Sequence, residues 1–540
     1  MDKLPLLLTL ILTFAALPAW LGTPAAAAQP LADYNGDGYT DLAIGVPGEV
    51  VNGQSGAGMV NAIYGSPAGL SATAASDQRI FQDFSIPGDP ASNISDASEA
   101  GDSFGGVLAS GDFNNDGRTD LAVGVPDEDV GPGVDAGAVN VIYGSPFGLS
   151  SAVLDDQFWH QDSANVEGFA DTSEHFGSAL AAGDFNGDGY DDLAVGTPLD
   201  YVDSIGGAGS VNVLYGSSSG LSADADQLWH QNVPGIEDSV DFGDHFASSL
   251  AAGDFNNDGR DDLAAGVPDE DINGQANAGL VNIIYGSSSG LTSASDQRFF
   301  QDYSEPDDLA SNIADSSEPN DHFGASLAAG DFDNNGSDDL LVGVPLEDIS
   351  AADQGAVAAI YGSPSGLAAA GNQLWSQDSS DVGDGGGGDG ANAGEEFGTA
   401  IASGDFNNDG YGDLAASAPH DAAGAASATP GAVNVIFGSA SGLSATTLPD
   451  QVWIGNNRLG GVQSMASGDF DGDGFDDLAM GQPSFDFSQV FFELHPRGAA
   501  TVLYGSVGEI GDDEVWSQDT PGVEDSAEDG EAFGSSVSAG

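Results

Sequence analysis

Short apolar runs, separated by turns rich in glycine and aspartate, recur along the whole chain. In the unit at 175–241 the runs are HFGSALAAG, DLAVGTP, GSVNVLYGS and DQLWHQ, with clusters of Gly, Ser, Asp and Pro between them. Runs this short, bounded by turn residues, are typical of β-strands. No window shows a sustained apolar period of 3.6 residues, so the pattern predicts four strands per unit and almost no helix.

The strands are organised around an acidic phrase that occurs seven times, at intervals of 64 to 79 residues. Its first copy reads DYNGDGYTDLAIGVP. Four short antiparallel strands repeated radially are the blade of a β-propeller. The sequence therefore predicts an all-β fold, a seven-bladed β-propeller with four antiparallel strands per blade. The seven copies begin at Asp33, Asp112, Asp184, Asp254, Asp331, Asp405 and Asp469.

The two ends of the repeat array indicate how the ring closes. No Phe-Gly run precedes the phrase at Asp33, whereas the final segment, EAFGSSVSAG, has such a run with no acidic phrase after it. We expect Phe533–Gly540 to supply the missing strand of the first blade, so that the N- and C-terminal segments pair and no sheet edge stays open. A longer array that continues past residue 540 is the alternative. The expected propeller domain is 29–540, with approximate blades 32–98 plus 531–540, 103–171, 175–241, 245–318, 322–392, 396–455 and 459–528.

Residues 1–28 have a different character. Lys3 precedes an apolar run that starts at Leu4, and the run ends in the small residues Ala26–Ala28. This order is typical of a secretory signal peptide, which we expect to be cleaved near Ala28. An uncleaved N-terminal anchor is the alternative. No later segment is apolar enough to span a bilayer, so we expect a secreted protein that is extracellular or associated with a cell surface.

Composition narrows the class of partner. The chain has 86 acidic residues against seven lysines and arginines, a formal net charge of −79. A charge of this sign excludes nucleic acid as a partner and simple electrostatic docking on anionic lipid. Cysteine is absent, so neither disulfides nor a cysteine-based zinc site contributes. Adaptation to high salt would explain the acidity, and ligation of metal by many of the carboxylates is the competing explanation.

The repeated phrase has the pattern D-x-[ND]-x-[DN]-G-x-x-D. The side chains at positions 1, 3, 5 and 9, with the backbone carbonyl at position 7, supply the oxygen ligands that Ca²⁺ prefers. Position 6 is glycine in all seven copies, where the chain must turn sharply. Position 12 is never glutamate, which distinguishes the loop from an EF-hand, and all-oxygen ligands disfavour zinc and copper. We predict up to seven structural Ca²⁺ sites, with a metal-free Asx turn as the alternative.

The predicted ligands are positions 1, 3, 5, 7 and 9 of each loop, where position 7 contributes only its backbone carbonyl. In chain order they are Asp33, Asn35, Asp37, Tyr39, Asp41; Asp112, Asn114, Asp116, Arg118, Asp120; Asp184, Asn186, Asp188, Tyr190, Asp192; Asp254, Asn256, Asp258, Arg260, Asp262; Asp331, Asp333, Asn335, Ser337, Asp339; Asp405, Asn407, Asp409, Tyr411, Asp413; and Asp469, Asp471, Asp473, Phe475, Asp477.

A Phe-Gly run, an acidic loop and a Gly-x-Pro, in that order and repeated, resemble the FG-GAP repeats of the integrin α-chain β-propeller and its bacterial and archaeal relatives. The fourth unit departs with Phe246-Ala247, the last with Leu459-Gly460, and the sixth has Ser417-Ala418-Pro419 in place of Gly-x-Pro. The presence of an acidic loop in all seven blades resembles the bacterial members of the family, since animal integrins carry such loops in only some of their blades. The Phe-Gly pairs begin at Phe104, Phe176, Phe323, Phe397 and Phe533, and the Gly-x-Pro segments at Gly45, Gly124, Gly196, Gly266, Gly343 and Gly481.

Antiparallel connectivity separates the loops onto two faces. The acidic loops and the YGSSSGLS-type turns share one face, and the variable connections between strands 2 and 3 and between blades share the other. Variable loops on a rigid scaffold commonly bind ligands, and the resemblance to integrins points to the same face. We expect an adhesion module that binds an extracellular protein or glycan there. The clusters Asp127–Asp129 and Asp269–Asp271 are interpreted as solvated acidic loops, with further cation sites as the alternative.

We expect no enzymatic activity, because histidines recur at equivalent places in the repeats, whereas an active site normally occurs once. His175, His245 and His322, for example, all precede the Phe of the Phe-Gly run. A glycan-binding propeller is the runner-up, and an accessory propeller of an extracellular hydrolase is less favoured. Similar propellers lie beside the catalytic domain of a glycosylphosphatidylinositol-specific phospholipase D, and no such domain is recognisable here. Stacking surfaces for glycans would come from five tryptophans, although packing in the outer strands is the favoured interpretation of these residues: Trp159, Trp229, Trp375, Trp453 and Trp516.

Overall fold

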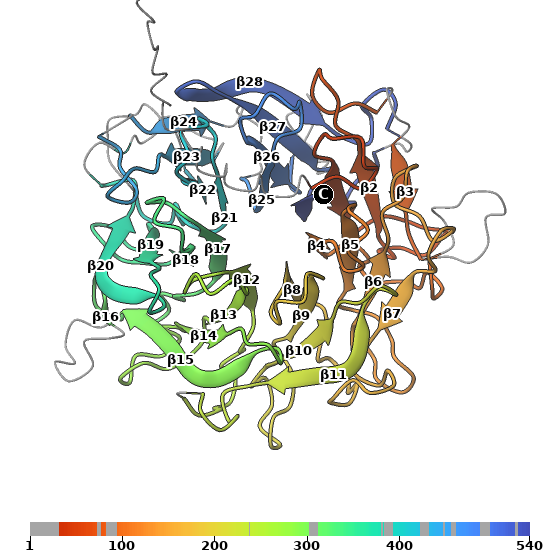
Figure 1. Cartoon of the computed structure of the whole chain (residues 1–540), viewed down its shortest axis with the longest axis horizontal. Coiled ribbons are helices and arrows are strands. Elements are labelled where there is room, and N and C mark those ends of the chain that lie inside the picture. The colour runs from red at the N-terminus through yellow and green to blue at the C-terminus, as the bar shows by residue number, and fades with distance from the viewer. Residues whose placement is uncertain are drawn as a thin grey trace, which may run out of the picture.

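The computed structural model describes most of the chain downstream of residue 31. The described residues form seven sheets around a central axis (Figure 1), and no helix occurs among them. The prediction of an all-β, seven-bladed propeller is confirmed. The predicted signal peptide, 1–28, lies outside the described residues. These are 32–72, 77–82, 94–236, 238–301, 312–379, 382, 392–421, 431–446, 449–454, 461–485, 497–523 and 527–540.

Each sheet contains four antiparallel strands that follow one another outward from the axis, and one sheet has a fifth strand in addition. The innermost strands are β29 (Val537–Ala539), β4 (Val107–Gly111), β8 (Ala179–Gly183), β12 (Ser249–Gly253), β17 (Ser326–Gly330), β21 (Ile401–Gly404) and β25 (Ser464–Gly468). The second strands are β1 (Leu42–Val46), β5 (Asp120–Val125), β9 (Asp192–Thr197), β13 (Asp262–Val267), β18 (Asp339–Val344), β22 (Asp413–Ala418) and β26 (Asp477–Gln482).

The two outer positions complete each sheet. The third strands are β2 (Met59–Ile63), β6 (Ala138–Ile142), β10 (Ser210–Tyr215), β14 (Leu280–Tyr285), β19 (Ala356–Tyr361), β23 (Ala432–Ile436) and β27 (Ala499–Ser506). The outermost strands are β3 (Gln78–Ile80), β7 (Gln157–Trp159), β11 (Ser222–Trp229), β15 (Thr292–Gln301), β20 (Ala368–Trp375), β24 (Gln451–Ile454) and β28 (Glu509–Trp516).

The hydrophobic core is divided into layers between neighbouring blades. The second strands are buried along their whole length, because both faces of each sheet are covered by the next sheet. One such layer packs Val139 and Val141 of β6 against Leu193 and Val195 of β9. This packing explains why the repeated DLAVG segment is apolar throughout and does not alternate with polar residues.

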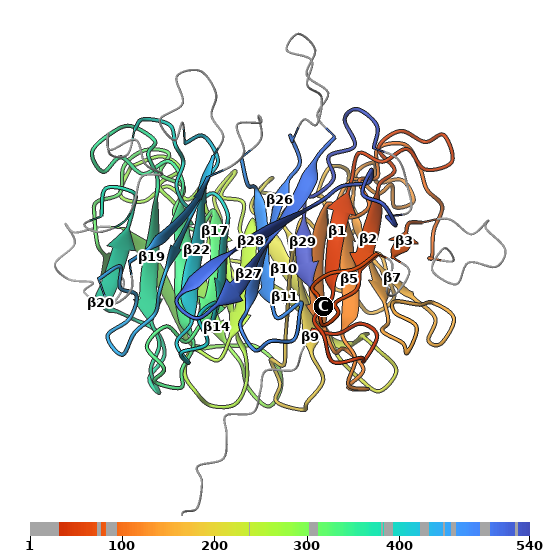
Figure 2. The same ribbon diagram turned by 90° about the horizontal axis from the view of Figure 1, so that it is seen from above.

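The ring is closed by the last strand. β29 pairs antiparallel with β1, with Ile44 opposite Val537 and Leu42 opposite Ala539, and the two strands lie side by side in Figure 2. The innermost strands of neighbouring blades contact one another in the cyclic order β29, β4, β8, β12, β17, β21, β25 and back to β29. The predicted pairing of the N- and C-terminal segments is therefore confirmed.

One sheet departs from the predicted four antiparallel strands. β16 (Asn312–Ile313) adds a fifth strand, parallel to β15, with Gln301 opposite Ile313. A related parallel bridge joins Gln82 to Ile94 at the outer edge of the first blade. Both come from the connection to the next blade, which the repeat pattern predicted only as a loop.

The Phe-Gly and Gly-x-Pro motifs meet between neighbouring blades. Phe104 is fully buried and forms a parallel bridge to Gly58 of the preceding blade. A Cβ atom at Gly45 would lie 2.0 Å from the carbonyl oxygen of Gly105, and one at Gly124 would lie 2.3 Å from that of Gly177. Glycine in Gly-x-Pro therefore permits the close approach of two backbones from adjacent blades.

We expect Gly124→Ala to destabilise the propeller, because the added methyl group would collide with the backbone of the next blade. Overpacking of this kind typically costs about 1–3 kcal/mol of unfolding free energy. Chemical denaturation measures the change. Gly511→Ala is the matched control, since a Cβ there meets no atom within 4 Å. Equal stability of the two variants would contradict the inferred close packing.

Candidate metal centre

Each acidic loop joins the innermost strand of a blade to the second strand. Its shape depends on glycine at position 6, which adopts a positive φ in every copy, for example +82° at Gly117 and +96° at Gly38. Only glycine adopts this region without strain. In the second loop, the Asp112 carboxylate at position 1 accepts hydrogen bonds from the backbone N–H groups of Asp116 and Gly117, at 3.1 and 2.9 Å. The turn is therefore wrapped around the first carboxylate.

The carboxylate at position 9 is the most enclosed part of the loop. Asp120 is fully buried and accepts hydrogen bonds from the backbone N–H groups of Phe113, within its own loop, and of Gly144, which follows the third strand. The bond to the glycine after the third strand recurs in all seven blades, at 2.7–2.8 Å. Position 9 thus joins the acidic loop to the turn between strands 3 and 4.

Positions 1, 3 and 9 converge. Carboxylate oxygens of Asp331, Asp333 and Asp339 all lie within 4.8 Å of one another, and those of Asp469, Asp471 and Asp477 do the same in the seventh loop. In four of the five loops with asparagine at position 3, its amide lies beside the position 9 carboxylate, as Asn114 does beside Asp120 at 3.1 Å. The structure therefore gathers three of the five predicted ligand positions.

Position 5 is placed differently. Asp473 is not part of the close group in its loop, and in the second loop the equivalent Asp116 accepts a hydrogen bond from the N–H of Arg118 at 3.1 Å. Coordination by position 5 and by the carbonyl of position 7 stays a prediction.

Burial has a strong effect on the position 9 carboxylates. Desolvation raises the pKa of Asp41 to about 9, and nearby Asp33 and Asp37 add to this rise, although hydrogen bonds from Gly65 and Tyr34 oppose it. Desolvation likewise raises the pKa of Asp120 well above its usual range. It raises the pKa to about 8 in Asp192, Asp262, Asp339, Asp413 and Asp477.

This environment fits a bound cation. A buried carboxylate is costly to ionise unless a positive charge lies beside it, and these have other carboxylates as neighbours. All the gathered donors are oxygens, which match a hard cation such as Ca²⁺. The observations that support the fit are the convergence of positions 1, 3 and 9 and the burial of position 9.

Sequence reasoning missed two features of the loops. An aromatic residue at position 2 is fully buried in every copy, as Phe113 and Tyr34 are. The recurrence of an aromatic residue directly after the first aspartate could have indicated this burial from the sequence. The N–H of position 8 donates to the carbonyl of position 1 in the preceding loop, in all seven pairs, and Thr40 closes the circle by donating to Asp469. The seven loops therefore form one continuous hydrogen-bonded ring.

The comparison with protein families agrees with the repeat pattern. The FG-GAP repeat model matches seven segments, one in each blade: 30–60, 104–142, 176–214, 246–283, 323–360, 397–432 and 461–503. The chain belongs to the FG-GAP repeat family. Of the departures from the motif, Ala247 takes the place of glycine with a φ of +67°, and Leu459-Gly460 lies outside the described residues.

Curated relatives include enzymes and integrins. Phosphatidylinositol-glycan-specific phospholipase D of Rattus norvegicus is 37% identical over 169 residues, 31% of this chain and 18% of that protein. Integrin alpha-5 of Xenopus laevis is 31% identical over 243 residues, 44% of this chain and 20% of that protein. The chain thus spans about a fifth of the length of these relatives. Resemblance to the bacterial form of the family stays a prediction.

Among solved structures, the exotype rhamnogalacturonan lyase YesX matches with a TM-score of 0.37 and 10% identity, over 85% of this chain and 73% of that one. A similarity at this level carries no argument about function.

We expect Asp333→Ala to remove one bound Ca²⁺ ion, because it deletes the oxygen at position 3 of the fifth loop. With free Ca²⁺ at ten times Kd, the loss would lower the unfolding free energy by about 1.4 kcal/mol. Calorimetric titration measures the number of ions bound. Asp333→Asn is the matched control, since asparagine occupies position 3 in five of the seven loops. The same number of ions bound by both variants would contradict the assignment of position 3.

Proposed function

We propose that this FG-GAP protein is a secreted, calcium-binding propeller that acts as a protein–protein or cell-surface adhesion module. Positions 1, 3, 5 and 9 of each loop, with the carbonyl of position 7, would hold up to seven Ca²⁺ ions. The bound ions would neutralise the buried carboxylates and stabilise the turns. In this proposal the metal has a structural role and the chain has no enzymatic activity.

A cavity on the face opposite the acidic loops is the observation that carries the proposal. It has a volume of about 580 Å³ and lies where the connections of the third and fourth blades meet. Its lining includes Tyr201 and Phe242, together with His245 and Asp269, whose side chains lie 2.5 Å apart. Phe242 is 86% exposed and Tyr201 is 59% exposed. Exposed aromatic side chains at the rim of a cavity are typical of binding sites.

The chemistry of the cavity indicates the class of partner. Two exposed aromatic rings offer apolar contact area, and the strongly acidic chain would favour a partner with a basic surface. An extracellular protein that presents apolar and basic side chains meets both conditions. Nucleic acid does not, because its phosphates would be repelled.

A glycan ligand is the second candidate, because Tyr201 and Phe242 could stack against sugar rings. The tryptophans support it less, since Trp229 and Trp516 are buried in outermost strands and cannot reach a ligand in solution. The less favoured function, an accessory propeller of an extracellular hydrolase, would share this surface with a catalytic chain.

We expect Phe242→Ser to weaken ligand binding by at least about tenfold, as truncation of an aromatic anchor typically does. Binding is measured with the Ca²⁺-loaded protein on an array of purified extracellular and cell-surface proteins and, in parallel, on a glycan array. Phe147→Ser is the matched control, because Phe147 is 85% exposed but lies on the face of the acidic loops.

Selective loss of protein binding in the Phe242 variant supports the adhesion module, and selective loss of glycan binding supports the alternative. Equal binding by both variants would contradict the proposed surface. Turnover of polysaccharide or phosphoester substrates by the purified chain would contradict a purely binding role.

A further inference from the structure

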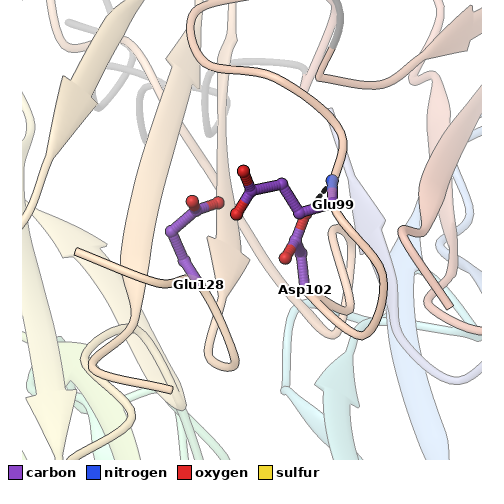
Figure 3. Close-up of side chains that lie close together, drawn as sticks. All are labelled: Glu99, Asp102 and Glu128. Carbon is purple, nitrogen blue, oxygen red and sulfur yellow. Dashed lines mark hydrogen bonds between the residues drawn. The ribbon is translucent and has the colours of Figure 1, made fainter. Parts of the chain in front are cut away.

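A second kind of acidic cluster lies on the face opposite the acidic loops. Glu99 and Asp102 come from the connection between β3 and β4, and Glu128 comes from the connection between β5 and β6. Their carboxylate oxygens all lie within 4.8 Å of one another, and in Figure 3 the carboxyl groups of Glu99 and Glu128 point toward each other. The cluster therefore joins residues from two different connections.

The same arrangement occurs a second time, three blades further round the ring. Glu318 and Asp321 precede β17, Glu347 follows β18, and their carboxylate oxygens also lie within 4.8 Å of one another. We call these two groups the glutamate clusters.

Two of the three acids in each cluster are buried, whereas Glu99 is exposed and Glu318 is half-buried. Asp102 and Glu128 are 2% and 1% exposed, and Asp321 and Glu347 are buried to the same degree. The interpretation of Asp127–Asp129 as a solvated acidic loop is therefore wrong for Glu128, and that of Asp269–Asp271 is wrong for the buried Glu270. The exposed members of these clusters are Asp129 and Asp271, whereas Asp127 and Asp269 are half-buried. Within the described part of the chain, no basic side chain forms an ion pair with either glutamate cluster.

Each cluster also contains a buried amide with an unused oxygen. Gln82 is 1% exposed, and its Nε2 donates to Glu128 at 2.8 Å, while its Oε1 has no hydrogen-bond partner. In the other cluster, Gln301 is equally buried, its Nε2 donates to Glu347, and its Oε1 is again without a partner. Buried polar atoms in folded proteins are nearly always paired, so these exceptions require an explanation. The equivalent glutamines at four other junctions, Gln161, Gln231, Gln377 and Gln518, also have a buried Oε1 without a partner, so the unpaired amide oxygen distinguishes the two clusters only together with the convergence of their three carboxylates.

Two carboxylate oxygens of the second cluster share this property. Glu318 Oε2 and Glu347 Oε1 are buried and have no hydrogen-bond partner. An ionised oxygen left in this state is costly unless a cation contacts it.

A cation among the acids would contact the carboxylates and the glutamine Oε1 together. The two ends of a glutamine amide are nearly identical in shape, so a half-turn of the amide exchanges Oε1 and Nε2. In that orientation Oε1 would face the neighbouring glutamate, and the pair would be favourable only with a positive ion between them. Three carboxylates and one amide oxygen, with no nitrogen or sulfur donor, match the ligand set of Ca²⁺.

We propose that each glutamate cluster binds one divalent cation of the calcium type. Gln82 follows the outermost strand of the first blade, whereas Glu128 belongs to the second blade, so the ion joins neighbouring blades. Gln301 and Glu347 are related in the same way between the fourth and fifth blades. The ions lie on the face opposite the acidic loops, and their binding does not depend on those loops.

The other junctions between blades share the buried glutamine, but their acids are not gathered in the same way among the described residues. At the junction with the third blade the equivalent acids are Asp171, Glu174 and Asp200. There the hydrogen bond from Gln161 Nε2 to the Asp200 carboxylate is long, at 3.4 Å. Their carboxylates are not gathered within the same distance among the residues that the structure describes. We assign sites only to the two glutamate clusters, because only there, among the described residues of these junctions, do three carboxylates converge.

The test counts Ca²⁺ ions per chain in the full-length protein, after removal of metal and dialysis against buffered Ca²⁺, by mass spectrometry. We expect the double variant Glu99→Ala, Glu318→Ala to bind two ions fewer than the wild type. The matched control, Asp129→Asn with Asp348→Asn, removes the same two charges from exposed neighbours and retains their hydrogen-bond acceptors. Equal ion counts for the double variant and the control would overturn the proposal.

A second measurement uses the unmodified protein and so does not depend on the folding of a variant. Crystals grown in Ca²⁺ should give an anomalous difference peak among Glu99, Asp102 and Glu128, with Gln82 Oε1 directed toward it. A water molecule or no peak there would overturn the proposal. Occupancy of the acidic loops is scored separately in the same map, so failure of the loop sites and failure of the glutamate clusters are distinguishable.

Discussion

The rest of the propeller depends on the interactions of a buried aspartate at the start of each second strand. Asp120 is an example. Its carboxylate accepts hydrogen bonds from the backbone N–H groups of Phe113 and Gly144, and it lies beside the other acids of its loop. The two hydrogen bonds fix the acidic loop and the turn between strands 3 and 4 in one geometry. They also hold the carboxyl group out of water, where its ionised form is costly unless a positive charge lies beside it.

The same loops connect the blades. The bond from position 8 to the carbonyl of position 1 in the preceding loop runs through all seven junctions and closes between Thr40 and Asp469. Each loop is therefore shared between two blades, and an ion that orders one loop also orders its neighbour. On the far side of each blade, the contact between Phe-Gly and Gly-x-Pro serves a similar purpose through close backbone packing. The ring needs no disulfide, and the chain has no cysteine.

Much of this architecture could be predicted from the sequence because it is encoded locally and repeatedly. Strand number, loop chemistry and the pairing of β29 with β1 all follow from the pattern of one unit and from how the array begins and ends. Other features could not be predicted, because they depend on contacts between units. The position 8 bonds use backbone atoms that leave no trace in the sequence, and β16 belongs to a connection between blades whose pairing with β15 the repeat pattern does not encode. Glu128 looks like one of three exposed acids until the fold buries it beside Asp102.

The direct test of the account compares thermal unfolding of the metal-free protein with unfolding of the same sample after Ca²⁺ is restored, with residual metal checked by mass spectrometry. If ions neutralise the buried aspartates, removal of metal should lower Tm markedly, and Ca²⁺ should restore it in a concentration-dependent way. A metal-free protein that unfolds at the same temperature with and without Ca²⁺ would contradict the account.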